Sequence, residues 1–550
     1  MNDSPVSVCA MFSRRTLQVA LSLSVCVAAL LGTSLAAAPQ AVVDYANEVG
    51  PHPADARIAN VGTPTFGGTL NVAENELIPS IDSHRSSART TTIVNSVFAE
   101  GLFAFNAVGG SHPALVDTYD VSEDGLVYTF TLRPGVKFHD GSDLRSSDVV
   151  ASLNRWQGGT LGRQAAENIS TLEAVDDLTV RINLSAPHPF LIYQLTVPQT
   201  SGAYIYPAAQ VEANPDLDIE VPIGTGPYFI SERREGQFTA FDRFDDYVGR
   251  VEAPSGFAGG QVAYVDRIVL HEIPDAAVRA AGVESGQFHM IRQATPDLYR
   301  IYENHPTVRP NVQTGSFASA NFNKCQGIMT DIRLRLAVRK AIDVRQVVAA
   351  VGPAEFNVAT SSFAPPGDPW DTPIGDEAYF GYDPEGAREL MAEAGYTNQP
   401  IRWLVDPNVP SYYTAALVSK PMLEEVGFNV EIMPMDAATL RTMRNDPTRY
   451  ELYAQSLAWR PDPAALTHLS DGNPGCWVTD EKNRILDALR AETDFDVRYQ
   501  LWEELTEQYY EDVAGVKFES YGTLDLEAKV YSGSFSAWAY YNFINTWLND

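Results

Sequence analysis

The sequence predicts an α/β protein with more than one domain. The chain has 550 residues, of which 45% are hydrophobic and 10% aromatic, so it is long and apolar enough to bury several cores. Strand-like and helix-like segments alternate from about residue 67 to the C-terminus, which is typical of mixed sheets covered by helices. No internal repeat accompanies this alternation.

The charge balance excludes two classes of partner. The chain has 39 Lys and Arg against 70 Asp and Glu, which gives a formal net charge of −31. Nucleic acid needs a cation for each phosphate contact, and a strongly negative field repels it. The same field disfavours docking on an anionic membrane surface. We therefore expect no nucleic-acid partner and no membrane partner of this kind.

The N-terminus has the pattern of an export signal. Arg14 and Arg15 precede the apolar stretch 17–31, and three alanines follow at 36–38. A positive start, a short apolar segment and small residues at the cut define a secretory signal peptide, here residues 1–38. We therefore expect a periplasmic protein, exported by either the general or the twin-arginine route. Residues 39–66 contain four prolines and no periodicity, and are interpreted as an N-terminal extension.

Strands are expected at Gly67–Ala73 and, as a meander, over Asp124–Gly141. Tyr128, Phe130 and Leu132 alternate with less apolar residues, which is the period of a half-buried strand. Turns are expected at the Pro-Gly and Asp-Gly pairs that follow.

Four helices can be recognised from their apolar spacing and start signals. One begins at Ser146 or Ser147, one at Asp331, one at Asp383-Pro384 and one near Asp496. The third has an acidic N-cap, proline at the first helical position and a glycine at its end, which makes its bounds the clearest.

Two cysteines, Cys325 and Cys476, follow the predicted signal peptide. In an oxidising compartment they are expected either to form one disulfide or to remain as two buried thiols. Neither lies in a Cys-x-x-Cys pair, so zinc and redox chemistry receive no support.

Four motifs follow one another along the chain. They are the run Asp124-Gly125-Leu126-Val127-Tyr128-Thr129-Phe130-Thr131-Leu132-Arg133-Pro134-Gly135-Val136-Lys137-Phe138-His139-Asp140-Gly141, then Asp148-Val149-Val150, then Gly224-Thr225-Gly226-Pro227-Tyr228, and finally Asn321-Phe322-Asn323 with Arg333, Arg335, Ala337 and Ala341-Ile342-Asp343. In this order they resemble the family 5 extracytoplasmic solute-binding proteins of ABC importers, the class that includes dipeptide, oligopeptide, nickel and opine binders.

The resemblance implies a periplasmic-binding-protein-like fold, with two αβ lobes, a hinged interlobe cleft and an extra domain. It implies domain I at 67–95, 195–315 and 515–550, domain II at 96–194, and domain III at 316–514. The implied function is capture of a small peptide, or of a peptide-like or opine-like solute, and its delivery to the membrane permease. The protein is expected to be a monomer that needs no cofactor and is not an enzyme.

The resemblance also suggests which residues meet the ligand. From the first lobe, Arg89 is expected either to hold a ligand carboxylate or to be a solvated loop arginine. From the other lobe, Asn323 is expected either to reach the cleft or to hydrogen-bond its own backbone. The segments Pro187–Phe190 and Tyr204–Tyr206 are interpreted as packing.

The most informative segment is 457–463, which includes Trp459, Arg460 and Asp462. It resembles the region in which peptide binders use an aspartate to hold the ligand's amino group. Arg460 occupies that neighbourhood, and a cation repels an ammonium group. Either Asp462 takes over that role or the ligand presents an anion here, with Trp459 as a stacking wall in both cases.

Other functions receive less support. The sequence has no Gly-x-Ser-x-Gly, His-Glu-x-x-His or Gly-x-x-x-x-Gly-Lys motif, which disfavours a secreted hydrolase. The nine histidines are dispersed, so no metal site is predicted, although nickel, metal-chelate or oligosaccharide binding by the same fold stays open.

Overall fold

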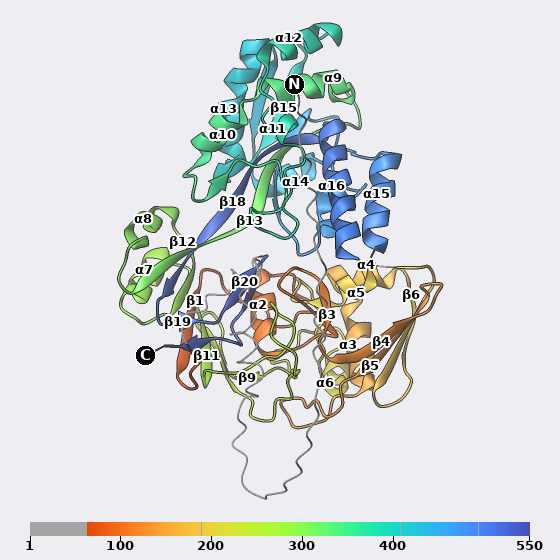
Figure 1. Ribbon diagram of the computed structural model, residues 1–550, viewed down its shortest axis with the longest axis vertical. Coiled ribbons are helices and arrows are strands. Elements are labelled where there is room, and N and C mark those ends of the chain that lie inside the picture. The colour runs from red at the N-terminus through yellow and green to blue at the C-terminus, as the bar shows by residue number, and fades with distance from the viewer. Residues whose placement is uncertain (1–62, 189, 408, 493, 539, 550) are drawn as a thin grey trace, which may run out of the picture.

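A computed structural model describes residues 63–188, 190–407, 409–492, 494–538 and 540–549. The predicted signal peptide and nearly all of the extension 39–66 lie outside these described residues. Figure 1 shows two bodies, here called the lower and the upper body, joined by two long strands. The predicted α/β class is confirmed. The predicted domain boundaries remain a prediction.

One mixed sheet runs through both bodies. Within the described residues it has eleven strands, and both parallel and antiparallel pairs occur. In spatial order, its main path is β16 (Asn429–Pro434), β15 (Pro400–Val405), β17 (Leu452–Ala458), β13 (Val308–Phe322), β18 (Gly515–Ala528), β12 (Met290–Ala294), β1 (Thr69–Glu74), β11 (Arg267–Glu272), β10 (Phe238–Arg243) and β9 (Tyr228–Arg234). The short strand β14 (Asn357–Val358) pairs with β18 off this path.

The antiparallel strands β13 and β18 connect the two bodies (Figure 1). Their register runs from Val308 opposite Ala528 to Asn321 opposite Gly515, with shifts at two points. At one end β18 pairs with β12 of the lower body, and at the other end β13 pairs with β17 of the upper body. Two crossing strands are the kind of connection about which two lobes can open and close.

The helices of the upper body cover its part of the sheet. All but the helix Ala437–Met443 bury apolar side chains in the largest core, and Leu440 of that helix lies in a separate small cluster. They are α9 (Ile332–Ala341), α10 (Val344–Val351), α11 (Asp376–Tyr379), α12 (Pro384–Glu393), α13 (Pro410–Val426), α14 (Ala437–Met443), α15 (Asp480–Ala491) and α16 (Phe495–Glu511). The predicted starts at Asp331 and Asp383 are confirmed, because each carboxylate accepts a hydrogen bond from the first turn. The last helix starts at Phe495, with Asp494 as its N-cap.

The lower body carries smaller sheets beside its part of the large one. A four-stranded antiparallel sheet has the order β4 (Val116–Val121), β5 (Val127–Leu132), β7 (Thr179–Leu184), β6 (Ile169–Ala174). A second sheet has the order β3 (Ser111–Pro113), β2 (Phe103–Phe105), β8 (Thr196–Val197). Two further sheets have two antiparallel strands each, β19 (Tyr531–Ser532) with β22 (Trp547–Leu548) and β20 (Phe535–Ala537) with β21 (Tyr540–Asn542). Its helices are α2 (Arg89–Phe98), α3 (Ser146–Trp156), α4 (Thr160–Ala166), α5 (Leu191–Gln194), α6 (Ala208–Ala213), α7 (Ala276–Glu284) and α8 (Tyr299–Tyr302).

The predicted alternation over Tyr128–Leu132 is confirmed in β5, where the three apolar side chains are buried. The serine cap predicted for the next helix is wrong. Ser146 is already the first residue of α3, and the carboxylate of Asp148 instead accepts a hydrogen bond of 2.8 Å from the backbone N–H of Arg145. An acidic residue at the third helical position therefore replaces the hydroxyl cap.

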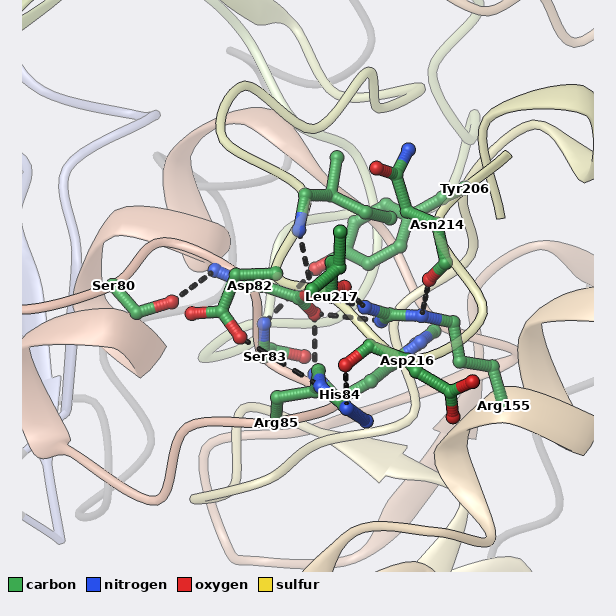
Figure 2. Close-up of polar contacts among 12 residues, drawn as sticks. Ser80, Asp82, Ser83, His84, Arg85, Arg155, Tyr206, Asn214, Asp216 and Leu217 are labelled. Atoms are coloured by element: carbon green, nitrogen blue, oxygen red, sulfur yellow. Dashed lines mark hydrogen bonds and ion pairs between the residues drawn. The ribbon is translucent and has the colours of Figure 1, made fainter. Parts of the chain in front are cut away.

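A buried ion pair fastens α3 to the rest of the lower body (Figure 2). The guanidinium of Arg155 donates to both oxygens of Asp82, and its side chain is 4% exposed while that of Asp82 is 0% exposed. Arg155 also donates to the carbonyl oxygens of Asn214 and Leu217, at 3.1 and 2.8 Å. Asp82 accepts a further bond of 2.9 Å from the backbone N–H of Ile219. Three separate segments of chain therefore meet at one ion pair.

Cys325 and Cys476 form a disulfide in the upper body, which decides between the two states predicted for them. It links the residues after β13 to the loop between η5 (Thr467–Leu469) and α15. The backbone N–H of Lys324 also donates to the carbonyl oxygen of Gly475, at 2.9 Å. The loop is therefore fixed to the end of β13, which is one of the two strands that connect the bodies and are called the hinge strands.

The burial of His468 predicts that the free energy of unfolding depends on pH. Its ring lies among Phe317, Phe363 and Tyr509, and burial lowers its pKa to about 3, with Lys482 as a smaller cause. The unfolded chain takes up a proton below about pH 6.5, whereas the folded protein does not, so stability is lost as the pH falls. Between pH 7 and pH 5, the free energy of unfolding should fall by about 2 kcal/mol more in the wild type than in a His468→Leu variant.

Chemical denaturation at the two pH values checks this prediction. His112→Gln, which removes an exposed histidine, is the matched control and should retain the pH dependence of the wild type. Equal pH dependence in the wild type and in His468→Leu would contradict the prediction.

Candidate functional site

A large cavity lies between the two bodies. It has a volume of about 980 Å³ and is called the main cavity. The lower body contributes side chains that include Ser87, Tyr193 and Gln199, and the upper body contributes Arg460 and Asn473. In Figure 1, α4 and α5 of the lower body face the ends of α15 and α16 of the upper body at this place. The cavity is therefore an interlobe cleft of the size that holds a small solute.

A second cavity of about 470 Å³ adjoins the hinge strands and is called the hinge cavity. Residues 309–314 of β13 and Glu527 of β18 form one side, and the indoles of Trp459 and Trp538 form another. Arg309 is paired with Glu527 at 2.8 Å, so this cation is already neutralised by the protein. Most of the remaining wall is made of neutral polar and small residues, with Asp368 as a further acidic residue.

Trp459 and Arg460 are adjacent in sequence but line different cavities. Trp459 follows β17 and is 0% exposed, its backbone N–H donates to the carbonyl oxygen of Gly315 at 2.7 Å, and its ring packs on Trp502. Its indole Nε1 has no hydrogen-bond partner among the described residues.

Arg460 is half-buried and lines the main cavity. Among the described residues, its guanidinium takes part in none of the ion pairs or hydrogen bonds, whereas the nearby Arg490 pairs with Asp487 at 3.6 Å. An arginine without a protein anion in a cleft is suited to bind a carboxylate in a bidentate manner.

Tyr193, which no sequence motif marks, lies close to Arg460. Burial raises the pKa of its hydroxyl well above the usual value, Asp462 adds to this effect, and Arg460 opposes it. The hydroxyl therefore stays protonated at neutral pH and can donate a hydrogen bond. Arg460 and Tyr193 line the main cavity from the two bodies, and both side chains are hydrogen-bond donors.

Asp462 is not available as an amine-binding group. Its carboxylate is paired with Arg498 of α16 at 2.6 Å and also accepts a bond of 2.9 Å from the backbone N–H of Ala464. Burial raises the pKa of this carboxyl, and Arg498 and the backbone bond oppose that effect. Of the two interpretations of this segment, the geometry thus favours a ligand that presents an anion to Arg460.

The other two predicted ligand residues do not line either cavity. Arg89 is the first residue of α2 and donates to the carboxylate of Glu76 at 3.1 Å. Asn323 is 2% exposed, and its amide donates to the carbonyl oxygens of Pro447 and Tyr450. Both side chains are engaged within their own body, so their contact with a ligand remains a prediction.

The segment at 187–190, interpreted as packing, lines the main cavity instead. Pro187, His188 and Phe190 all form part of its wall, and Phe190 stacks on Tyr193. Their order in the sequence carries no sign of this role, because a proline-rich loop is equally typical of surface packing. Tyr204 and Tyr206 are buried, as expected.

Metal ligands are not grouped anywhere within the described residues: no three His, Cys, Asp or Glu side chains lie together so as to hold an ion. No helix in the same part of the chain is long and apolar enough to cross a membrane.

The fold and the cleft define a two-lobed protein that encloses a small solute between its lobes. The family model for bacterial extracellular solute-binding proteins, family 5 middle, matches residues 111–474. The chain belongs to this family.

Two curated relatives and one solved structure are similar to this chain. The chain is 29% identical over 408 residues to a probable peptide ABC transporter periplasmic-binding protein, y4tO, of Sinorhizobium fredii, with 71% of this chain and 76% of the relative covered. It is 30% identical over 384 residues to the glutathione-binding protein GsiB of Pectobacterium atrosepticum, with 66% and 69% covered. The structure of HbpA2 from Haemophilus parasuis aligns with a TM-score of 0.76 at 21% identity, covering 88% of this chain and all of that one, which shows the shared fold.

Proposed function

We propose that this chain is the periplasmic solute-binding component of an ABC import system, and that it carries a peptide or peptide-like solute with a free carboxylate to the permease. Membership of the solute-binding family and the similarity to a peptide-transport protein and to glutathione-binding proteins support this proposal. In this role the protein acts as a monomer that binds and releases its solute without chemical change.

The proposed class of ligand rests on which charged side chains beside the cleft are already paired within the protein. Arg460 faces the main cavity and, among the described residues, has no protein anion as a partner, whereas Asp462 is held by Arg498. The segment therefore lacks the free aspartate that would bind an ammonium group, and it offers a guanidinium that can bind a carboxylate. Glutathione has two carboxylates besides its ammonium group, so one carboxylate can pair with Arg460, and a carboxylate of an opine can do the same.

The mechanism follows from the two bodies and their hinge. In the open form the cleft is hydrated, and a ligand first contacts one lobe. Closure about β13 and β18 then adds contacts from the other lobe, so the ligand stabilises the closed form by its extra affinity for it. For a carboxylate ligand, Arg460 of the upper body and Tyr193 of the lower body provide such contacts, and Trp459 provides an apolar wall.

Isothermal titration of the purified mature protein tests this proposal. With glutathione as the probe, we expect saturable binding at one site, and we expect Arg460→Ala to weaken it by about tenfold or more because a desolvated charge-assisted pair is lost. Arg490→Ala is the matched control, since Arg490 lines the same cavity but is paired with Asp487. Equal affinity in the wild type and in Arg460→Ala would contradict the role of Arg460.

A further inference from the structure

The tip of the β2–β3 hairpin is a tight, preformed turn in the lower body. The side-chain oxygen of Asn106 accepts hydrogen bonds from the backbone N–H groups of Val108 and Gly110, at 3.1 and 2.8 Å. The N–H of Gly109 donates to the carbonyl oxygen of Asn106, at 3.0 Å. These bonds hold Gly109 at a φ of +85°, in the left-handed region that favours glycine. The tip is therefore rigid.

This tip touches the upper body at Pro461. A Cβ atom on Gly109 would lie 2.2 Å from the carbonyl oxygen of Pro461, and 2.9 and 3.2 Å from its carbonyl carbon and Cα. All three are backbone atoms, so no side-chain rotation can relieve the collision. Only a movement of one body away from the other, or a distortion of one of the two segments, could accommodate a methyl group there.

Both partners of this contact are held firmly and lie beside the cavities. Pro461 directly follows Arg460 and precedes Asp462, which is fixed by Arg498. On the lower side, Phe105 and Ala107 are buried in the same apolar cluster as Trp459 of the upper body. The hairpin tip thus meets the segment that carries the candidate ligand residues.

We propose that Gly109 is a closure determinant: the absence of a side chain at this position lets the hairpin tip seat against Pro461, and this seating defines the closed state. A larger residue at 109 holds the bodies apart, while the open state, in which the two segments are separated, does not experience the collision. The inference rests on the proposed function, because closure around a solute is what the contact would control. Gly109 acts as a positioning residue and does not itself contact the ligand.

The matched control is Gly141, which has a φ of +86° but nothing within 4 Å of the position of an added Cβ. Gly109→Ala and Gly141→Ala therefore carry similar backbone strain, and only the first introduces the collision. Gly109→Asn is a second variant, because asparagine tolerates a positive φ better than alanine but brings the same Cβ.

The distance between the two bodies gives a readout of closure that can be measured with and without a ligand. Spin labels at Glu123→Cys in the lower body and Glu389→Cys in the upper body, both exposed positions, report it in full-length mature protein with and without glutathione. We expect a short-distance fraction in the wild type and in Gly141→Ala, and its loss in Gly109→Ala and Gly109→Asn. A wild-type fraction retained in both Gly109 variants would overturn the inference, and so would a wild type that binds glutathione and still lacks the short distance.

Affinity separates this inference from the proposed function. We expect glutathione to bind Gly109→Ala at least about tenfold more weakly than Gly141→Ala, because ligand binding must then displace the population toward a state that the collision disfavours. If the wild type does not bind glutathione, the proposed ligand is wrong. The distances in the ligand-free proteins then decide the role of Gly109, because the short-distance fraction should again be smaller in Gly109→Ala than in Gly141→Ala.

Discussion

Replacement of Arg155 by alanine is expected to lower the free energy of unfolding by about 3–5 kcal/mol, the range measured when one partner of a buried ion pair is removed. The variant leaves the carboxylate of Asp82 inside the protein with its cation gone. It also removes the donors to the carbonyl oxygens of Asn214 and Leu217, which tie a third segment to the pair (Figure 2). Urea denaturation followed by circular dichroism measures this effect.

The residue that precedes this helix supplies a control. Arg145, immediately before α3, forms an ion pair with Asp177 that is mostly exposed. Arg145→Ala should change the free energy of unfolding by no more than about 1 kcal/mol, because solvent screens exposed pairs. If Arg155→Ala and Arg145→Ala were equally stable, the proposed role of the buried pair in fastening α3 would be wrong.

Arg498→Ala is expected to damage both stability and ligand binding. Arg498 is the partner of the buried Asp462, and its loss should cost about 3 kcal/mol or more at neutral pH. Without Arg498, burial raises the pKa of Asp462 further, so the carboxyl takes up a proton more easily. The loss of stability should therefore be smaller at pH 5 than at pH 7. Binding should weaken as well, because Asp462 anchors the segment that carries Arg460 and Pro461.

The double variant Asp462→Asn, Arg498→Met separates charge from packing. It removes both charges while keeping side chains of similar size, and it should recover most of the stability lost in Arg498→Ala. If the double variant failed to recover stability, the contact would act through its shape and hydrogen bonds, and the electrostatic explanation of the Arg498→Ala effect would be wrong.

Local features of the fold could be predicted from the sequence because their causes are local. The start of α12 depends on Asp383 and the adjacent proline, and the burial of Tyr128, Phe130 and Leu132 depends on a period of two residues. The motif order was also sufficient to indicate the family, since each motif marks a fixed place in the chain.

The partners of the site residues could not be predicted because they are distant in sequence. Asp462 is a candidate for binding an amine by its position, but its charge is matched by Arg498 on a helix that begins 33 residues later, at Phe495. Asn323 is a candidate for the cleft, but its amide is used by the backbone at Pro447 and Tyr450. Gly109 carries no signal in the sequence, since its collision partner Pro461 becomes visible only when the two bodies are placed together.

The most direct test of carboxylate recognition compares glutathione with its diethyl ester, which has no free carboxylate, in titrations of the wild type and of Arg460→Ala. We expect the wild type to bind glutathione at least about tenfold more tightly than the ester, and Arg460→Ala to lose most of this preference. Equal binding of the two ligands by the wild type, or an undiminished preference in Arg460→Ala, would contradict the claim that the interlobe cleft recognises a carboxylate through Arg460.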